Sequence, residues 1–311
     1  MWKDKRVHVL GGTGFLGSRL TAVLREQGAD VRPISTRNGW DLRDRTQAKG
    51  AVAGADAVFN CAAHQGGLGY QSVAPERIFT DNLLIQASVM EWHRVMNNGP
   101  LVSVTAGCGY PDGLEIMREE DWESGPVHHS VAAYGTVQRV KVQMTRAYWQ
   151  AGCHRYIAPI LINLYGPGDH FHPDKSHGMA ALIRRFLDAT EDGSGEVVLW
   201  GTGNAVREWT YVDDAVEGLM RLAEVYRSPD PVNLATGEGV SVGDLAREIA
   251  SVVHFTGRIR FDPSKPEGVL RKIASVERLE THLGWKPSTS RLEGIERTVK
   301  HLVDHYEEAV A

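Results

Sequence analysis

The sequence predicts an α/β fold in which helices cover both faces of a doubly wound parallel sheet, with a smaller α/β lobe attached. Three observations lead to this prediction. Apolar strand-like runs alternate with helical patterns through the first half of the chain, a glycine-rich turn joins the first strand to the first helix, and the last third mixes helices with short strands. The chain has 311 residues, which is enough to bury one large core or two interleaved ones.

Each element is predicted from a buried apolar run or from helical periodicity bounded by turn residues. In the first part, strands are expected over 6–10, 31–34, 57–60, 101–105 and 156–161, and helices over 16–27, 77–97 and 132–150. In the last third, helices are expected over 179–189, 214–226, 242–253 and 292–307, short strands over 197–200, 208–212 and 233–234, and a surface loop over 191–196. Residues 1–170 and about 208–236 are predicted to form the large domain, and about 171–207 and 237–311 the smaller lobe.

The composition argues against several classes of protein. The formal net charge is −5 and the pI is near 6.2, which disfavours a general nucleic-acid or membrane-surface role but allows a local basic pocket. No apolar run reaches the roughly 18 residues needed to span a membrane, and no signal-peptide segment follows the N-terminal residues. The 3 cysteines lack paired spacing, so neither a disulfide framework nor a metal site is expected. We therefore predict a cytoplasmic protein with no nucleic-acid or membrane partner.

The turn after the first strand has the spacing of a dinucleotide-binding site. Gly11, Gly14 and Gly17 lie between that strand and a helix, where glycines allow a tight turn, close approach of the backbone to a pyrophosphate, and close helix–strand packing. The first helical residues, Phe15 and Leu16, belong to a helix start whose N–H groups and dipole favour phosphate charge. The large domain is therefore predicted to be an NAD(P)-binding Rossmann domain.

The end of the second strand favours NADP(H) over NAD(H). Sites for NAD usually carry an acidic residue there, which binds the ribose 2′-hydroxyl, whereas this strand runs into Ser35, Thr36 and Arg37. The guanidinium of Arg37 would suit a 2′-phosphate through charge-assisted hydrogen bonds. Asp41 and Leu42 lie where a loop could flank the adenine. NAD(H) stays open as the alternative cofactor.

Further blocks of sequence resemble the extended short-chain dehydrogenase/reductases of the NAD-dependent epimerase/dehydratase family, and among them the GDP-L-fucose synthase family. The similarity runs along essentially the whole chain. Its most specific blocks are QGG at 65–67, DNLLIQ at 81–86, CGYP at 108–111, NLYGP at 163–167, FHP at 171–173, SH at 176–177, ALIRRF at 181–186, WGTG at 200–203, RE at 207–208, KPEG at 265–268 and RK at 271–272.

The resemblance implies two activities in one site. Epimerisation beside the ketone of a 4-keto sugar would use a cysteine and a histidine as the acid–base pair, and these fall on Cys108 and His177. Reduction at C4 by NADPH would use a tyrosine, which falls on Tyr134. Cofactor contacts are implied at four further positions along the sheet edge: Ala62, Ala63, Tyr134 and Leu161.

Two catalytic positions depart from the family pattern. The serine or threonine position falls on Ala106, and the lysine position falls on Gln138, which carries no charge. A lysine would lower the pKa of the Tyr134 phenol. Oxidising a hydroxyl needs a phenolate, whereas reducing a ketone needs the neutral phenol, so the loss of lysine hurts oxidation more than reduction. The substrate is therefore expected to arrive as a ketone, unless another group replaces the lysine.

Lys141 is the candidate replacement. It lies three residues beyond Gln138 on the same helical surface, but it is two turns from Tyr134, at the limit of its reach. Arg139 points about 100° away from Gln138. Thr105 does not replace a hydroxyl at position 106, because adjacent strand residues face opposite sides.

A sugar-nucleotide pocket is also implied by the resemblance. Its residues would be Asn163, Trp200, Arg207, Lys265 and Arg271. Arginine binds a diphosphate through bidentate contacts, and tryptophan can cover a base or ribose face. The GDP moiety of the substrate, and a homodimer formed through the helices at 77–97 and 132–150, rest on the resemblance alone.

Three functions stay open at this point. The first is a GDP-sugar epimerase acting on a 4-keto hexose, with or without reduction at C4. It is favoured because a thiol and an imidazole both exchange protons near neutral pH. The second is an NAD-dependent epimerase that oxidises C4 transiently, which fits Gln138 least. The third is a catalytically silent protein that binds NADP or a sugar nucleotide.

Overall fold

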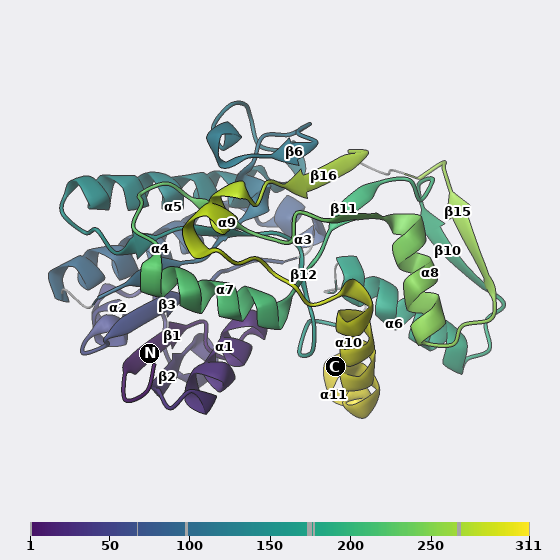
Figure 1. Ribbon diagram of the computed structural model, residues 1–311, viewed down its shortest axis with the longest axis horizontal. Coiled ribbons are helices and arrows are strands. Elements are labelled where there is room, and N and C mark those ends of the chain that lie inside the picture. Colours follow the sequence, from purple (N-terminus) through teal and green to yellow (C-terminus); the bar gives the residue numbers. More distant parts are fainter. Residues whose placement is uncertain are drawn as a thin grey trace.

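The computed structural model describes residues 2–66, 68–96, 99–172, 176, 178–265 and 269–310 (Figure 1). A parallel sheet runs through the larger part of the molecule in the order β2–β1–β3–β4–β7. Its strands are β1 (Arg6–Leu10), β2 (Asp30–Ile34), β3 (Ala57–Asn60), β4 (Leu101–Ser103) and β7 (Tyr156–Ile157). Just beyond β4 and β7, three more parallel strands pair in the order β13–β8–β5: β5 (Thr105–Ala106), β8 (Pro159–Leu161) and β13 (Val232–Leu234).

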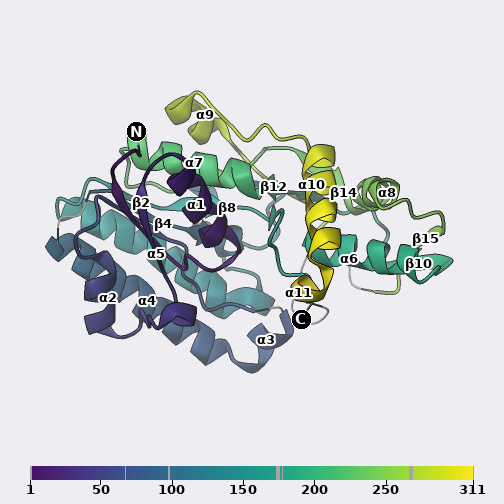
Figure 2. The same cartoon turned by 90° about the horizontal axis from the view of Figure 1, so that it is seen from below.

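Helices cover both faces of this sheet (Figures 1 and 2). On one face α1 (Phe15–Glu26) and α7 (Val212–Val225) bury Leu20, Leu24 and Leu219 against β1 and β3. On the other face lie α2 (Arg45–Val52), α4 (Pro75–Met96) and α5 (Ala132–Gln150), where Val89 and Met90 pack against residues of β1 and β3. The predicted doubly wound α/β fold is therefore confirmed.

A second lobe has its own sheets and core, and lies to the right in Figure 1. One sheet has the order β14–β11–β16–β6, and a second pairs β10 with β15. The strands are β6 (Ile116–Met117), β10 (Glu196–Trp200), β11 (Val206–Glu208), β14 (Gly239–Ser241), β15 (Arg258–Asp262) and β16 (Arg271–Ala274). The helices are α6 (Gly178–Glu191), α8 (Val242–Val252), α10 (Arg291–Asp304) and α11 (Tyr306–Val310). Between the lobes β9 (Leu164–Tyr165) pairs with β12 (Thr210–Tyr211).

The structure departs from the sequence prediction mainly at short elements. The strands expected over 101–105, 156–161 and 208–212 are each divided, at Val104, Ala158 and Trp209, and the helix expected over 292–307 ends at Asp304. Several short elements were not predicted from the sequence: α2, α3 (Leu68–Val73), α9 (Glu277–Leu283) and the strands β6, β9, β14, β15 and β16. Leu279 of α9 packs into the core of the large domain, although 277–283 falls in the segment predicted for the smaller lobe. No helix in the part of the chain described above is long and apolar enough to cross a membrane.

Candidate active site

The turn between β1 and α1 is open to an anion at the helix N-terminus. Gly14 caps α1 without any side-chain hydrogen bond, and the first turn of the helix carries no acidic residue. A Cβ added at Gly17 would lie 2.2 Å from the carbonyl oxygen of Gly11, so the close approach of helix and turn requires glycine. The N–H groups of this helix start, including those of Phe15 and Leu16, can therefore face a phosphate group.

Arg37 lies beside this turn. It belongs to a short 3₁₀ segment, η1 (Thr36–Asn38), directly after β2, and its guanidinium donates a hydrogen bond to the Thr13 carbonyl oxygen at 3.3 Å. The Asp41 carboxylate is instead 2.7 Å from the guanidinium of Arg43, which lowers the pKa of Asp41. An exposed arginine next to the glycine turn fits the 2′-phosphate of NADP.

The structure describes four other predicted cofactor residues. Leu42 is buried, Ala62 lies against the glycine turn, and Ala63 is exposed. Leu161 is buried in the core and pairs with Ala106 across β8 and β5. The glycine turn, Ala62 and Leu161 thus share the carboxyl edge of the parallel strands, where α/β sheets bind their ligands.

Tyr134 and Cys108 lie close together at this edge. Tyr134 is in the first turn of α5 and 8% exposed, and Cys108 belongs to a 3₁₀ segment, η2 (Gly107–Gly109), that follows β5. A Cβ at Gly135 would lie 2.5 Å from the Cys108 carbonyl oxygen, so α5 packs directly on η2. Burial, together with the nearby Cys108, raises the pKa of the Tyr134 phenol. Burial also raises the pKa of the Cys108 thiol to about 12, opposed by the ammonium groups of Lys272 and Lys141.

Gln138 does not point toward the phenol. It is 0% exposed, and its amide nitrogen donates to the carbonyl oxygen of Tyr134 at 3.3 Å, back along its own helix. Its amide oxygen is buried and has no hydrogen-bond partner among the residues described. Ala106 lies in β5, and no hydroxyl replaces the missing one there. Position 106 therefore carries no hydroxyl group, and position 138 carries an uncharged amide.

Two cations of α5 do approach the Cys108 segment. Arg139 donates a hydrogen bond to the Gly109 carbonyl oxygen at 2.7 Å, and Lys141 donates one to the Val104 carbonyl oxygen at 2.9 Å. Lys141 is 3% exposed, and burial lowers its pKa to about 8. Its side chain leans toward the N-terminus of the helix, which brings the amine to the carboxyl edge of the sheet.

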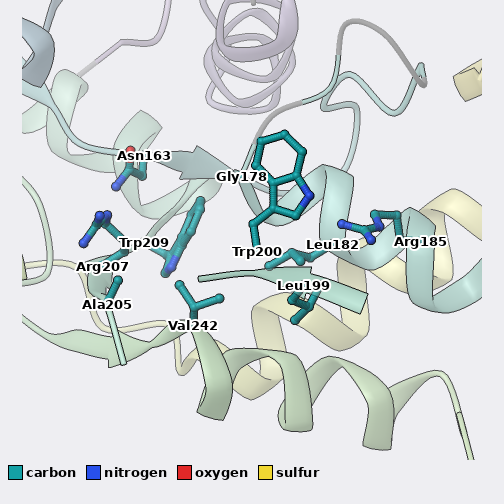
Figure 3. Close-up of a pocket in the computed structure, with 10 residues that line it drawn as sticks. All are labelled: Asn163, Gly178, Leu182, Arg185, Leu199, Trp200, Ala205, Arg207, Trp209 and Val242. Atoms are coloured by element: carbon teal, nitrogen blue, oxygen red, sulfur yellow. The ribbon is translucent and has the colours of Figure 1, made fainter. Parts of the chain in front are cut away.

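A cavity of about 420 Å³ lies in the second lobe, next to this edge. Figure 3 shows the rings of Trp200 and Trp209 between Arg207 and Asn163 on one side and Arg185 on the other. The full lining is Asn163, Gly178, Leu182, Arg185, Leu199, Trp200, Ala205, Arg207, Trp209 and Val242. Lys265 lies 6.0 Å from the ring centre of Trp200. The structure thus gathers the predicted Asn163, Trp200, Arg207 and Lys265, and adds Arg185 and Trp209.

Lys272, and not Arg271, lies beside the pocket residue Arg207. In the parallel pair β11–β16, Arg207 lies opposite Lys272, whereas Arg271 lies opposite Val206. Paired residues share a face of the sheet and their neighbours along the strand take the other face, so exposed Arg271 points away from Arg207. The half-buried Lys272 interacts electrostatically with Cys108 and Arg207, and its pKa is lowered by burial. The prediction of Arg271 as a pocket residue does not fit this register; strand alternation could have indicated Lys272.

His177 lies outside the described residues, so its predicted pairing with Cys108 stays a prediction.

Asn163 has a left-handed backbone, with φ at 37°, and its side chain donates to the Glu208 carbonyl oxygen at 2.8 Å. This hydrogen bond ties the end of β8 to β11 and hence the two lobes to each other. A strained backbone at such a junction is typical of a functional site.

Comparison with known proteins places this site in a family. Residues 7–235 match the model of the family described as "NAD dependent epimerase/dehydratase family". The chain belongs to this family. The predicted family resemblance is thereby confirmed.

Individual relatives of this epimerase-family chain match over nearly their whole length. It is 30% identical to GDP-L-fucose synthase 1 of Arabidopsis thaliana, over 95% of this chain and 92% of that protein. It is 29% identical to GDP-L-fucose synthase of Escherichia coli (strain K12), over 97% of both. The crystal structure of a GDP-L-fucose synthetase from Naegleria fowleri bound to NADP superposes with a TM-score of 0.91 at 26% identity, covering 100% of this chain and 96% of that one.

Proposed function

We propose that this chain is an NADP(H)-dependent GDP-sugar epimerase/reductase that acts on a 4-keto hexose, with Cys108 and His177 as its acid–base pair. One observation carries the proposal. The residues Cys108 and Tyr134 lie together at the sheet edge, and Lys272 interacts electrostatically with Cys108 and with Arg207, which lines the cavity. The names of the relatives, which are GDP-L-fucose synthases, support the same class of substrate.

The acid–base step needs a proton acceptor and a proton donor beside the ketone. A C4 ketone acidifies the C–H bonds at C3 and C5, so that a base on one face and an acid on the other can invert the carbon. Cys108 would remove or return the proton on one face, helped by the ammonium of Lys272. Tyr134 would hold the C4 oxygen by donating a hydrogen bond to it, which stabilises the negative charge that develops there.

Reduction at C4 fits the state of Tyr134. When bound, NADPH would supply a hydride for the ketone. The glycine turn would hold its pyrophosphate, and Arg37 its 2′-phosphate. Because burial raises the pKa of Tyr134, the phenol keeps its proton at neutral pH and can donate it to the C4 oxygen. The same raised pKa opposes transient oxidation of a hydroxyl, so the alternative NAD-dependent epimerase is the weaker hypothesis.

The cavity of the second lobe would bind the GDP moiety. The faces of Trp200 and Trp209 can cover the base, and Arg207 and Lys272 can neutralise the diphosphate from one face of the β11–β16 pair. Lys265 would add positive charge near Trp200.

We also propose that the enzyme works in the cytoplasm, since its 3 cysteines are all free. We propose further that it forms a homodimer, and this proposal rests on the family resemblance.

The proposal is tested by mass spectrometry of GDP-4-keto-6-deoxymannose incubated with the protein in D2O, with and without NADPH. We expect enzyme-dependent uptake of deuterium at the sugar carbons, and a further gain of two hydrogens when NADPH is present. The Cys108→Ala variant should lose the uptake, at least a hundredfold, while its affinity for GDP stays unchanged. The matched control is Cys153→Ala, because Cys153 lies in the loop after α5 and away from Tyr134.

Three outcomes would count against the proposal. Undiminished exchange in Cys108→Ala would remove the thiol from the mechanism. Exchange without NADPH-dependent reduction would leave an epimerase and exclude the reductase. No turnover with any 4-keto sugar nucleotide, together with tight binding of NADP, would favour the catalytically silent alternative.

A further inference from the structure

The buried amine of Lys141 has no part in the function proposed so far. Its side chain is 3% exposed, and its printed hydrogen bond goes to the carbonyl oxygen of Val104 at 2.9 Å. Among the described residues, the acidic groups that act on it are the thiols of Cys108 and Cys61, and no carboxylate. A buried ammonium without a carboxylate partner costs stability, so its presence calls for a compensating role.

The amine binds a backbone carbonyl just after β4, where the hydrogen bonding between β3 and β4 stops. The N–H of Val104 donates to Asn60 of β3 at 3.0 Å, and the carbonyl of the same residue points toward the same neighbouring strand. There β3 has already ended, and the N–H of Ala62, which would pair with this carbonyl, donates instead to the side-chain oxygen of Asn60 at 3.2 Å. Lys141 therefore donates to a carbonyl that β3 leaves without a strand partner, at the edge where the site lies.

The thiol of Cys108 lies along the same edge. Its sulfur is 3.9 Å from the carbonyl oxygen of Ala106, which has an extended backbone. The carbonyls of Val104 and Ala106 are two residues apart in an extended segment, so they point to the same side, about 7 Å from each other. The ammonium on the first carbonyl and the thiol beside the second are thus neighbours at the carboxyl edge.

We propose that Lys141 is a positioning residue of the acid–base site, whose ammonium group stabilises the negative charge of the Cys108 sulfur and supplies, from one helical turn further on, the positive charge that Gln138 lacks. The inference rests on the proposed function, because it assigns a partner to the Cys108 thiol. Gln138 lies against the same segment, since a Cβ added at Gly109 would come within 3.1 Å of the Gln138 Cβ. Both positions therefore face η2.

Three titratable groups surround the Cys108 thiol. Lys141 and Tyr134 approach the thiol from α5, and Lys272 approaches it from β16. The carboxylate of Asp112 interacts electrostatically with Lys272. Both ammonium groups lower the pKa of the thiol, against the larger effect of burial. Removing either lysine should therefore raise the thiol pKa and lower the fraction of thiolate at a given pH.

The test measures the rate at which iodoacetamide alkylates Cys108 in the full-length protein between pH 6 and 10, with each cysteine quantified separately by peptide mass spectrometry. In Lys141→Met we expect alkylation of Cys108 to be about tenfold slower below pH 8, where the amine of the parent protein is charged, as for a rise of the thiol pKa by about one unit. Lys141→Arg should keep most of the rate. Gln138→Lys/Lys141→Met places a positive charge at position 138, and the alkylation rate should return toward that of the parent protein.

Two control variants show how large and how small the effect of removing a lysine can be. Lys272→Met removes the other ammonium near the thiol and should also slow alkylation. Lys300→Met removes an exposed lysine from α10 and should change nothing. A purely structural role for Lys141 would appear as a lower melting temperature in Lys141→Met with an unchanged Cys108 profile. A charge role predicts the opposite, because methionine relieves the buried charge and should raise the melting temperature.

The inference is overturned if the Cys108 profile of Lys141→Met coincides with that of the parent protein while Lys272→Met shifts it. A shift confined to Cys61 would also overturn it and would assign the amine to that thiol. The assay needs no substrate, so its result is independent of the deuterium experiment. An unaltered profile with normal deuterium uptake would refute the role of Lys141 alone, and a shifted profile without uptake would refute the proposed function alone.

Discussion

At the scale of single residues, Lys141 gives the chain an unusual dependence of stability on pH. Its folded pKa is about 8 because of burial, against about 10.4 for lysine in an unfolded chain. Between these values the unfolded state binds more protons than the folded state, so the free energy of unfolding rises with pH in that window. Below pH 8 the buried charge costs the folded state the full difference, on the order of 3 kcal/mol.

Lys141→Met should therefore be more stable than the parent protein at pH 7, and the difference should shrink as the pH rises toward 10. Urea unfolding at several pH values measures both free energies of unfolding. The comparison of the two proteins cancels the buried tyrosines, such as Tyr134 and Tyr165, whose raised pKa values lower stability above pH 10 in both. Parallel curves over the whole range would show that the amine has the same pKa in the folded and unfolded protein, so that burial does not disfavour its charge.

At the scale of elements, the turn between β1 and α1 depends on the smallest side chain at one position. A Cβ at Gly17 would lie 2.2 Å from a backbone oxygen of Gly11, which cannot move without displacing the turn from α1. Gly17→Ala should thus weaken NADPH binding by at least tenfold and lower the free energy of unfolding by about 1–3 kcal/mol. Gly14→Ala is the matched control, because its Cβ would be 3.3 Å from the same oxygen.

NADPH fluorescence titration and chemical unfolding measure the two effects. Equal affinities in the two variants would mean that close helix–turn packing is not what holds the phosphate. A loss of stability without a loss of affinity would separate the packing role of Gly17 from any role in cofactor binding.

At the scale of the whole molecule, the proposed dimer gives a prediction about surface leucines. Leu84 is 43% exposed on α4, which lies beside α5 on one face of the sheet, whereas Leu292 is 49% exposed on α10 in the other lobe. If α4 and α5 form the contact, Leu84→Glu places a charge in an apolar interface and should convert dimers to monomers. Leu292→Glu should leave the dimer intact.

Light scattering after size-exclusion chromatography gives the mass of each variant directly. A monomeric parent protein would refute the dimer itself. A dimer that survives Leu84→Glu but not Leu292→Glu would move the contact to the second lobe.

Much of this protein could be predicted from short stretches of its sequence. The spacing of Gly11, Gly14 and Gly17 predicts the phosphate turn, and the alternation of apolar strands and helices predicts the doubly wound sheet. These signals are local, because turn geometry and side-chain periodicity depend on residues a few positions apart. The family resemblance of the blocks around Tyr134 and Cys108 likewise predicts a site for a keto sugar nucleotide.

Only the tertiary structure decided which cations lie near the Cys108 thiol. The register of β11 against β16 joins residues more than 60 positions apart, and it selects Lys272 over the adjacent Arg271. Lys141 donates its hydrogen bond to the Val104 carbonyl oxygen because β3, the neighbouring strand, ends there and leaves that carbonyl without a strand partner. Where a strand ends and how two distant strands align are set by packing of the whole chain, so no local pattern in the sequence carries that information.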